Sequence, residues 1–271
     1  MQQHLIAIDL DGTTLNDKSK VSYTTIQTLR SLAEMGHLVV IATGRPYRNA
    51  IDIYRQIGIQ SPMINFNGAL CQFPERDRWL ASYHQELDKE IAFELLANQE
   101  DLDIDLIAVE GQRQLYTTSS NLPDSPFYPK DKSTIKRLSR ESLRQNPTAI
   151  SIFTAKDKEK SVEAEITRRY GDQVSVRTWG GILPMLEVVH KSINKAVGVN
   201  RVAEFYRIPR EAILTFGDEN NDLEMLEYAG LGVAMQNATE EVKAVADQVT
   251  PLTNDQDGLA HFLMDYFQFK I

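Results

Sequence analysis

The stretch Leu5-Ile6-Ala7-Ile8, followed directly by Asp9-Leu10-Asp11-Gly12-Thr13, decides the fold of this chain. Four apolar residues in a row, without alternation, are typical of a strand that is buried on both faces of a parallel sheet. Two carboxylates follow where that strand is expected to end. Ligands of open α/β sheets bind outside the carboxyl ends of the strands. The stretch therefore predicts a buried strand with a candidate site at its end, and an ordinary polar turn of Asp and Gly is the competing interpretation.

The same arrangement of an apolar run and a polar end recurs further along the chain. Residues 38–42 end in Thr43-Gly44-Arg45-Pro46, and residues 212–216 end in Gly217-Asp218-Glu219-Asn220-Asn221-Asp222. Strands that alternate with helical patterns imply a parallel, doubly wound, Rossmann-like sheet in an α/β core. The other elements expected in this core are helices at 22–35, 46–57 and 223–228, a helix with Lys195 in its first turn, and strands at 63–66 and 232–235.

The middle of the chain has a different order of expected secondary-structure elements. Adjacent strands joined by turns, as in a hairpin around Glu110-Gly111, indicate a mainly antiparallel sheet with helices packed on it. We therefore expect an inserted α+β cap domain at 85–186, between a first core segment at 1–84 and a second at 187–271. Its expected elements are helices at 88–98, 134–144 and 159–170, a strand at 149–154, and two more strands after the last helix.

The composition excludes several classes of protein. The chain has 271 residues, of which 42% are hydrophobic and 25% charged, as in ordinary globular proteins. A net charge of −9 without a basic run argues against a nucleic-acid partner. The single cysteine, Cys71, lies in an apolar stretch and is expected to be a buried small hydrophobe. The sequence shows neither the pattern of a signal peptide nor an apolar run of membrane-spanning length, so we expect no membrane partner and a cytoplasmic location.

Three expected strands end in polar groups at one edge of the sheet. Clustered carboxylates repel one another and raise one another's pKa unless a cation is present. A hard divalent ion with oxygen ligands resolves this repulsion, and Mg²⁺ is the usual one where phosphate is also bound. A metal beside a free carboxylate permits nucleophilic attack on phosphorus. The groups expected to meet at this edge are Asp9 and Asp11, Thr43, and Asp218 with Asn221 and Asp222.

Four short motifs carry a family resemblance. They are Asp9-Leu10-Asp11-Gly12-Thr13, Ala42-Thr43-Gly44-Arg45, Lys195, and Gly217-Asp218-Glu219-Asn220-Asn221-Asp222. In these residues the sequence resembles the haloacid dehalogenase superfamily of phosphatases, and specifically its Cof-type branch. Asn67-Gly68-Ala69, Gly232-Val233-Ala234-Met235 with Asn237-Ala238, and Asp257-Gly258 also resemble parts of the Cof pattern. One departure is Ala196, where the branch usually has Gly after the lysine.

The resemblance implies a role for each motif residue. Asp9 would be the nucleophile and Asp11 the general acid/base. Mg²⁺ would be held by the carboxylates of Asp9 and Asp218 and the backbone carbonyl of Asp11, with Asp222 supporting it through water. The cap would close over the site, exclude water and select the substrate. The residues that would bind the phosphate or the substrate are Leu10 and Gly44 through their amides, Thr43, Arg45, Lys195 and Asn221.

The resulting prediction is a Mg²⁺-dependent phosphatase that hydrolyses small phosphomonoesters, such as sugar phosphates or phosphorylated cofactors, through an aspartyl-phosphate on Asp9. Two alternatives stay open at this point. A phosphomutase would use the same motifs and return the phosphate to a sugar. A phosphate-ligand sensor without turnover would be expected to lack Asp9, Asp11 or Lys195, and all three are present.

Overall fold

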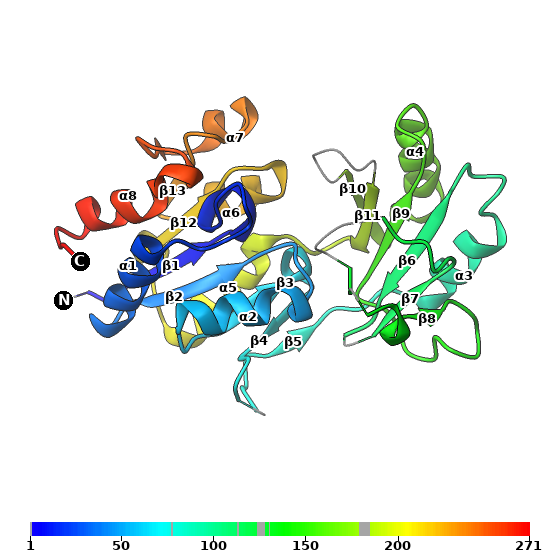
Figure 1. The fold of residues 1–271 in the computed structure, drawn as a ribbon, viewed down its shortest axis with the longest axis horizontal. Helices are drawn as coiled ribbons and strands as arrows, with labels where there is room; N and C mark the ends of the chain where they lie inside the picture. The colour runs from blue at the N-terminus through cyan, green and yellow to red at the C-terminus, as the bar shows by residue number, and fades with distance from the viewer. Residues whose placement is uncertain (1, 77, 113, 124–127, 130, 179–184) are drawn as a thin grey trace. The chain divides into compact units, whose positions relative to one another are not determined.

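The chain divides into two compact units. The computed structural model describes residues 2–76, 78–112, 114–123, 128–129, 131–178 and 185–271. Met1–Tyr83 and Asn194–Ile271 form one unit, which we call the core unit, and His84–Ile193 form the other, the inserted unit. In Figure 1 the core unit takes its colours from both ends of the scale and the inserted unit from the middle. The expected boundary at residue 186 falls inside strand β11 (Met185–His190), which pairs entirely within the inserted unit.

An eight-stranded sheet in the order β14-β13-β12-β1-β2-β3-β4-β5 forms the centre of the core unit. Strand β1 lies between β12 and β2 and is parallel to both. The strands from β14 to β3 are parallel, and β4 pairs with β3 in the antiparallel sense. The strands are β1 (Leu5–Ile8), β2 (Leu38–Ala42), β3 (Met63–Asn65), β4 (Leu70–Gln72), β5 (Tyr83–His84), β12 (Ile213–Gly217), β13 (Leu231–Ala234) and β14 (Gln248–Val249).

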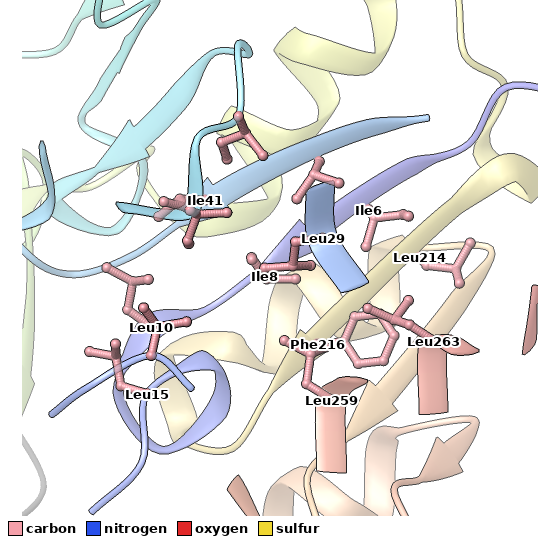
Figure 2. Close-up of a cluster of buried hydrophobic side chains, with 14 of the residues drawn as sticks. Ile6, Ile8, Leu10, Leu15, Leu29, Ile41, Leu214, Phe216, Leu259 and Leu263 are labelled. Atoms are coloured by element: carbon pink, nitrogen blue, oxygen red, sulfur yellow. The ribbon is translucent and has the colours of Figure 1, made fainter. Parts of the chain in front are cut away.

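Helices cover both faces of this sheet, so its central strands are buried throughout. Ile6 and Ile8 of β1 pack with residues of α1, α2 and α8 on one face, and Leu5 and Ala7 pack with residues of α5 on the other. Figure 2 shows the first of these clusters, with Leu29 and Leu263 directed toward the strand residues. The helices are α1 (Tyr23–Glu34), α2 (Tyr47–Ile57), α5 (Lys195–Tyr206), α6 (Leu223–Tyr228), α7 (Glu240–Val245) and α8 (Gly258–Tyr266).

Local sequence explains where helix α2 begins and ends. Pro46 occupies its N-cap, where the fixed φ of proline suits the helix start. The residues on one side of the helix recur every three or four positions and are buried against the sheet; they are Ala50, Ile51, Tyr54 and Ile57. Gly58 ends the helix with φ of 79°, a left-handed conformation that glycine adopts without strain. The loop that precedes this helix is thereby held at the end of β2.

The inserted unit is an α+β structure. Its sheet has the order β10-β11-β9-β6-β7-β8 and is antiparallel except for the pair β7–β8. Ile107, Ile150 and Leu186 from one face pack with α3 and α4. The elements are α3 (Lys89–Ala97), β6 (Leu106–Glu110), β7 (Leu115–Thr117), β8 (Lys136–Arg137), β9 (Ala149–Phe153), α4 (Glu159–Tyr170), β10 (Val174–Thr178) and β11.

The predicted fold class, a doubly wound parallel sheet with an inserted α+β unit, is confirmed. The expected helix at 134–144 is wrong, because β8 and a serine-rich turn occupy that stretch. Strands β4, β5 and β14 and helices α7 and α8 were not predicted. Cys71 is buried, and burial raises the pKa of its thiol to about 12. Among the described residues, no helix has the length and apolar character needed to span a bilayer.

Candidate active site

The carboxyl ends of β1, β2 and β12 bring the predicted site residues together. The register pairs Ile8 of β1 with Ile41 of β2 and with Phe216 of β12, so these strands end side by side. The Asp9 amide continues the ladder by donating to the carbonyl of Phe216 at 3.0 Å. Three loops that are distant in sequence therefore begin at the same level of the sheet. They are 9–14, 43–46 and 218–222.

Three buried aspartates form a cluster at this edge. One carboxylate oxygen from each of Asp9, Asp218 and Asp222 lies within 4.8 Å of the others. Burial raises the pKa of Asp9 to about 7, even though Lys195 opposes the shift, and the negative charges of Asp222 and Asp11 add to it. Burial, with the nearby charges of Asp9 and Asp222, raises the pKa of Asp218 to about 9. When all three aspartates are ionised, the cluster therefore carries more negative charge than the buried cation beside it neutralises.

Lys195 is the cation within this cluster. It is the first residue of α5, whose N-cap Asn194 accepts a hydrogen bond from the Val197 amide through its side chain. The Lys195 ammonium donates to Asp9 Oδ1 and to Asp222 Oδ1, each at 2.6 Å, and is completely buried. Burial alone would lower the pKa of Lys195, but the two carboxylates outweigh it and raise that pKa. Lys195 therefore stays charged at the centre of the site.

Asp222 is held by its own loop. Its Oδ2 accepts hydrogen bonds from the backbone amides of Asp218 at 3.0 Å and Glu219 at 3.2 Å, while Oδ1 faces Lys195. Both oxygens are thus engaged by N–H donors. This geometry suits a residue that orients its neighbours better than one that offers an oxygen to a metal directly.

The turn after β1 brings Asp218 close to Asp9. Gly12 has φ of 71°, and a Cβ atom there would lie 2.0 Å from Asp218 Oδ2. Only glycine lets the backbone pass this close to that carboxylate. The Thr13 hydroxyl donates to Asp218 Oδ1 at 2.8 Å, and the Thr14 hydroxyl donates to the Asp9 carbonyl at 2.5 Å. These contacts of Gly12, Thr13 and Thr14 were not predicted from the sequence.

The loop after β2 is linked to the loop after β3. The Asn67 amide donates to the Thr43 carbonyl at 3.1 Å, and the Asn221 side chain donates to Asn67 Oδ1 at 3.0 Å. Gly44 passes so close that a Cβ atom would lie 3.1 Å from Asn67 Oδ1. Asn67 therefore joins two predicted phosphate-binding residues, Thr43 and Asn221. Its place at the end of a neighbouring strand was the sequence signal that could have identified it.

Asp11 and Arg45 form a second ion pair at this edge. Arg45 Nε donates to Asp11 Oδ2 at 2.7 Å, and Arg45 Nη2 donates to Asp11 Oδ1 at 2.5 Å. The Arg45 side chain is almost fully buried, whereas that of Asp11 is 45% exposed. The two aspartates of the first motif therefore contact different cations. Arg45 was expected among the residues that bind the phosphate or the substrate, and this pair was not predicted.

The donor set of the aspartate cluster fits a hard divalent cation. Asp9 and Asp218 are buried carboxylates, and their pKa values are raised by burial and by the negative charges of neighbouring carboxylates. A divalent ion would neutralise these charges. Oxygen ligands of this kind suit Mg²⁺ or Ca²⁺ better than soft metals. Among the described residues, this cluster is the one group of at least three such side chains with metal-binding spacing.

Comparison with known proteins agrees with this geometry. The family model described as haloacid dehalogenase-like hydrolase matches residues 6–263. The chain is 36% identical to the 5-amino-6-(5-phospho-D-ribitylamino)uracil phosphatase YitU of Bacillus subtilis, over 97% of each chain. It is 32% identical to the phosphatase YwpJ of the same organism, over 96% of this chain and 98% of the relative. A haloacid dehalogenase-like hydrolase from Bacteroides thetaiotaomicron superposes with a TM-score of 0.84 at 27% identity, over 98% and 100% of the two chains.

The family match and the curated relatives, together with the α/β fold, define the class of this protein as a phosphatase. The chain belongs to the haloacid dehalogenase-like hydrolase family. The predicted family and the predicted enzyme class, a phosphoric monoester hydrolase of this family, are confirmed.

Proposed function

We propose that this protein is a Mg²⁺-dependent phosphatase that hydrolyses small phosphomonoesters through an aspartyl-phosphate on Asp9. The observation that carries the proposal is that Asp9 and Asp218 bring carboxylate oxygens within 4.8 Å of each other at the end of β1, while the buried Lys195 ammonium donates to Asp9 at 2.6 Å. A phosphoryl group bound there would meet a nucleophile, a cation and hydroxyl and amide donors at once. A small phosphorylated substrate and a cytoplasmic location are part of this proposal.

Asp9 and Asp218 would hold the metal through their carboxylates, with the backbone carbonyl of Asp11 as a further ligand and Asp222 acting through water. When bound, Mg²⁺ supplies charge neutralisation and Lewis-acid polarisation at the phosphoryl oxygens. The buried ammonium of Lys195, which donates to Asp9 Oδ1, contributes a further positive charge. These two cations would let an anionic ester approach a cluster that is itself negatively charged.

The reaction divides into two displacements. A carboxylate oxygen of Asp9 attacks phosphorus while the bond to the ester oxygen breaks, and Asp11 gives that oxygen a proton. Asp11 then takes a proton from a water molecule, which attacks phosphorus and releases Asp9 and inorganic phosphate. Thr43, Lys195, Asn221 and the amides of Leu10 and Gly44 would hold the transferring phosphoryl oxygens through both steps.

The name of one relative supports the choice of a first substrate class. Because a relative at 36% identity is named for a phosphoribityl substrate, a phosphate ester of a polyol or sugar is the first class to test. The panel would hold 5-amino-6-(5-phospho-D-ribitylamino)uracil, ribose 5-phosphate, glucose 6-phosphate, glycerol 3-phosphate and p-nitrophenyl phosphate. Phosphate release would be followed with Mg²⁺ and with a chelator.

Two variants make this test specific. Asp9→Asn removes the nucleophile, and Asp52→Asn changes an exposed aspartate of α2 as a matched control. We expect release that needs Mg²⁺ and Asp9 and is unaffected by Asp52→Asn. Formation of a positional isomer of a sugar phosphate, without release of inorganic phosphate, would favour the mutase. Binding without either reaction, by folded protein, would favour the sensor.

A further inference from the structure

We propose that Arg45 is a positioning residue that fixes the Asp11 carboxylate for proton transfer, rather than a ligand of the substrate phosphate. The inference rests on the proposed function in one respect, namely that Asp11 is the general acid/base. It concerns the pair in which Nε and Nη2 of Arg45 donate to the two oxygens of Asp11. The family resemblance alone placed Arg45 beside the phosphate.

The geometry of the pair fixes the orientation of the carboxylate. A guanidinium presents its donors in a rigid planar fork, so two parallel hydrogen bonds set both the position and the plane of the carboxylate they bind. A single contact, or a lysine ammonium, would leave that plane free to rotate. Asp11 needs such a constraint, because its side chain is 45% exposed and hydrogen-bonds to no other side chain among the described residues.

Arg45 is itself held firmly by its surroundings. Its backbone amide donates to the Thr43 hydroxyl at 3.1 Å, and its carbonyl accepts from the Asn65 side chain at 3.1 Å. Pro46 follows it and restricts its backbone to extended conformations. The side chain is only 7% exposed. The rigid partner in the pair is therefore Arg45, and the carboxylate it holds lies at the solvent-accessible side.

The arrangement separates the two aspartates by function. The Asp9 carboxylate contacts Lys195, and the Asp11 carboxylate contacts Arg45, although the two residues are separated by Leu10 alone. Because Nε and Nη2 of Arg45 are directed at Asp11, these donors do not point to a phosphoryl group on Asp9. Proton transfer to the ester oxygen and from water needs Asp11 at one defined place, and the fork supplies it.

The test uses the dependence on the leaving group. Proton donation matters greatly for an alkoxide leaving group and little for p-nitrophenolate, which is stable as an anion. We would measure kcat/KM and KM for p-nitrophenyl phosphate and for the alkyl monoester that the wild type hydrolyses best. The proteins are the wild type, Arg45→Met, Arg45→Lys, Asp11→Asn and the double variant Arg45→Met with Asp11→Asn. Arg55→Met, at an exposed arginine of α2, is the matched control.

The expected pattern is selective. Arg45→Met should lower kcat/KM for the alkyl ester by about 100-fold, in the range that general acid catalysis contributes, and affect p-nitrophenyl phosphate far less. KM should change little, and Arg45→Lys should lie between Arg45→Met and the wild type, because it keeps the charge without the fork. Adding Arg45→Met to Asp11→Asn should cause little further loss, because both act through one group.

Other outcomes would overturn the inference in distinguishable ways. An equal loss for both esters with a raised KM would make Arg45 a phosphate ligand. Unchanged kinetics in folded Arg45→Met would make the pair irrelevant to the reaction. If Asp11→Asn itself shows no preference for the good leaving group, the proposed role of Asp11 fails, and with it the basis of the inference. Should Arg45→Met not fold, the same comparison applies to Arg45→Lys.

Discussion

Lys195 donates from Nζ to Asp222 Oδ1 at 2.6 Å, and neither side chain has any exposed surface. A buried ion pair is weak evidence for stability in itself, but removing one partner leaves an uncompensated charge in the interior. Here the loss of the Lys195 ammonium would leave two carboxylates without their cation, because Asp9 contacts the same ammonium as Asp222. The pair therefore connects the stability of the core unit with its chemistry.

Lys195→Met is expected to lower the free energy of unfolding by about 3–5 kcal/mol in metal-free protein, because Asp9 and Asp222 lose their shared cation. Urea denaturation measures the loss, with Lys18→Met at an exposed lysine as the control. Adding Asp222→Asn to Lys195→Met should restore part of the stability, because it removes one of the two buried charges that have lost their cation. Equal stability of Lys195→Met and Lys18→Met would contradict this account.

Gly12→Ala should damage both stability and activity. Gly12 and Gly36 both have positive φ, so alanine at either is strained by about 1–2 kcal/mol. A Cβ at Gly36 would meet nothing within 4 Å, whereas one at Gly12 would collide with Asp218. Gly36→Ala thus measures the backbone strain alone. We expect Gly12→Ala to be the less stable variant in urea and to lose Mg²⁺-dependent phosphate release, which Gly36→Ala keeps.

The N-caps of α1 and α5 offer a comparison of stability with function. Ser22 accepts a hydrogen bond from the Thr25 amide, and Asn194 accepts one from the Val197 amide. Alanine at either cap should cost about 1 kcal/mol of stability. Only Asn194→Ala should also lower kcat, because the next residue is Lys195. A kcat that falls equally in both variants would indicate a general loss of stability instead.

In the metal-free protein, Asp9 and Asp218 should make a contribution to stability that falls as the pH rises from about 4 to 9. The pKa of Asp9 is raised to about 7 and that of Asp218 to about 9 from an ordinary value of 3.8, so the folded state holds more protons in this range. Their contribution to the free energy of unfolding then falls with increasing pH. Mg²⁺ should raise the melting temperature more at pH 8 than at pH 6, because fewer protons must be displaced.

Thermal melting with and without millimolar Mg²⁺ at several pH values checks this expectation. Asp218→Asn removes one of the two carboxylates and should weaken the Mg²⁺-dependent shift at every pH. A shift of the same size at pH 6 and pH 8 would place the bound ion away from Asp9 and Asp218.

Elements whose signals are local could be predicted from the sequence. The limits of β2, α4 and α6 agree with the expected ranges, because apolar runs and helical spacing act over a few positions. The helix expected at 134–144 does not form. In the structure the Ser142 hydroxyl donates to the Arg137 carbonyl, and Ser139 and Ser142 hydrogen-bond each other's amides. Serine side chains here replace the backbone ladder that a helix needs.

The candidate site was predicted as a set of strand ends but not as a set of contacts. The parallel strand order places Asp9, Thr43 and Asp218 at one edge of the sheet, independently of the contacts that their side chains make. Which cation meets which carboxylate depends on long side chains and distant loops. Arg45 could reach either the phosphate or Asp11, and the sequence between these two residues, which are 34 positions apart, does not indicate which. Contacts such as Thr13 with Asp218 are equally invisible in the sequence.

The position of β1 between β12 and β2 sets the order in which a newly made chain can fold. During synthesis, β1 and β2 leave the ribosome early, but one edge of β1 waits for β12, which emerges only after the whole inserted unit. The inserted unit is continuous in sequence and can fold first. Until β12 emerges, the apolar strand Leu5–Ile8, which leads directly into Asp9, is exposed along one edge, and a nascent chain would need a chaperone there.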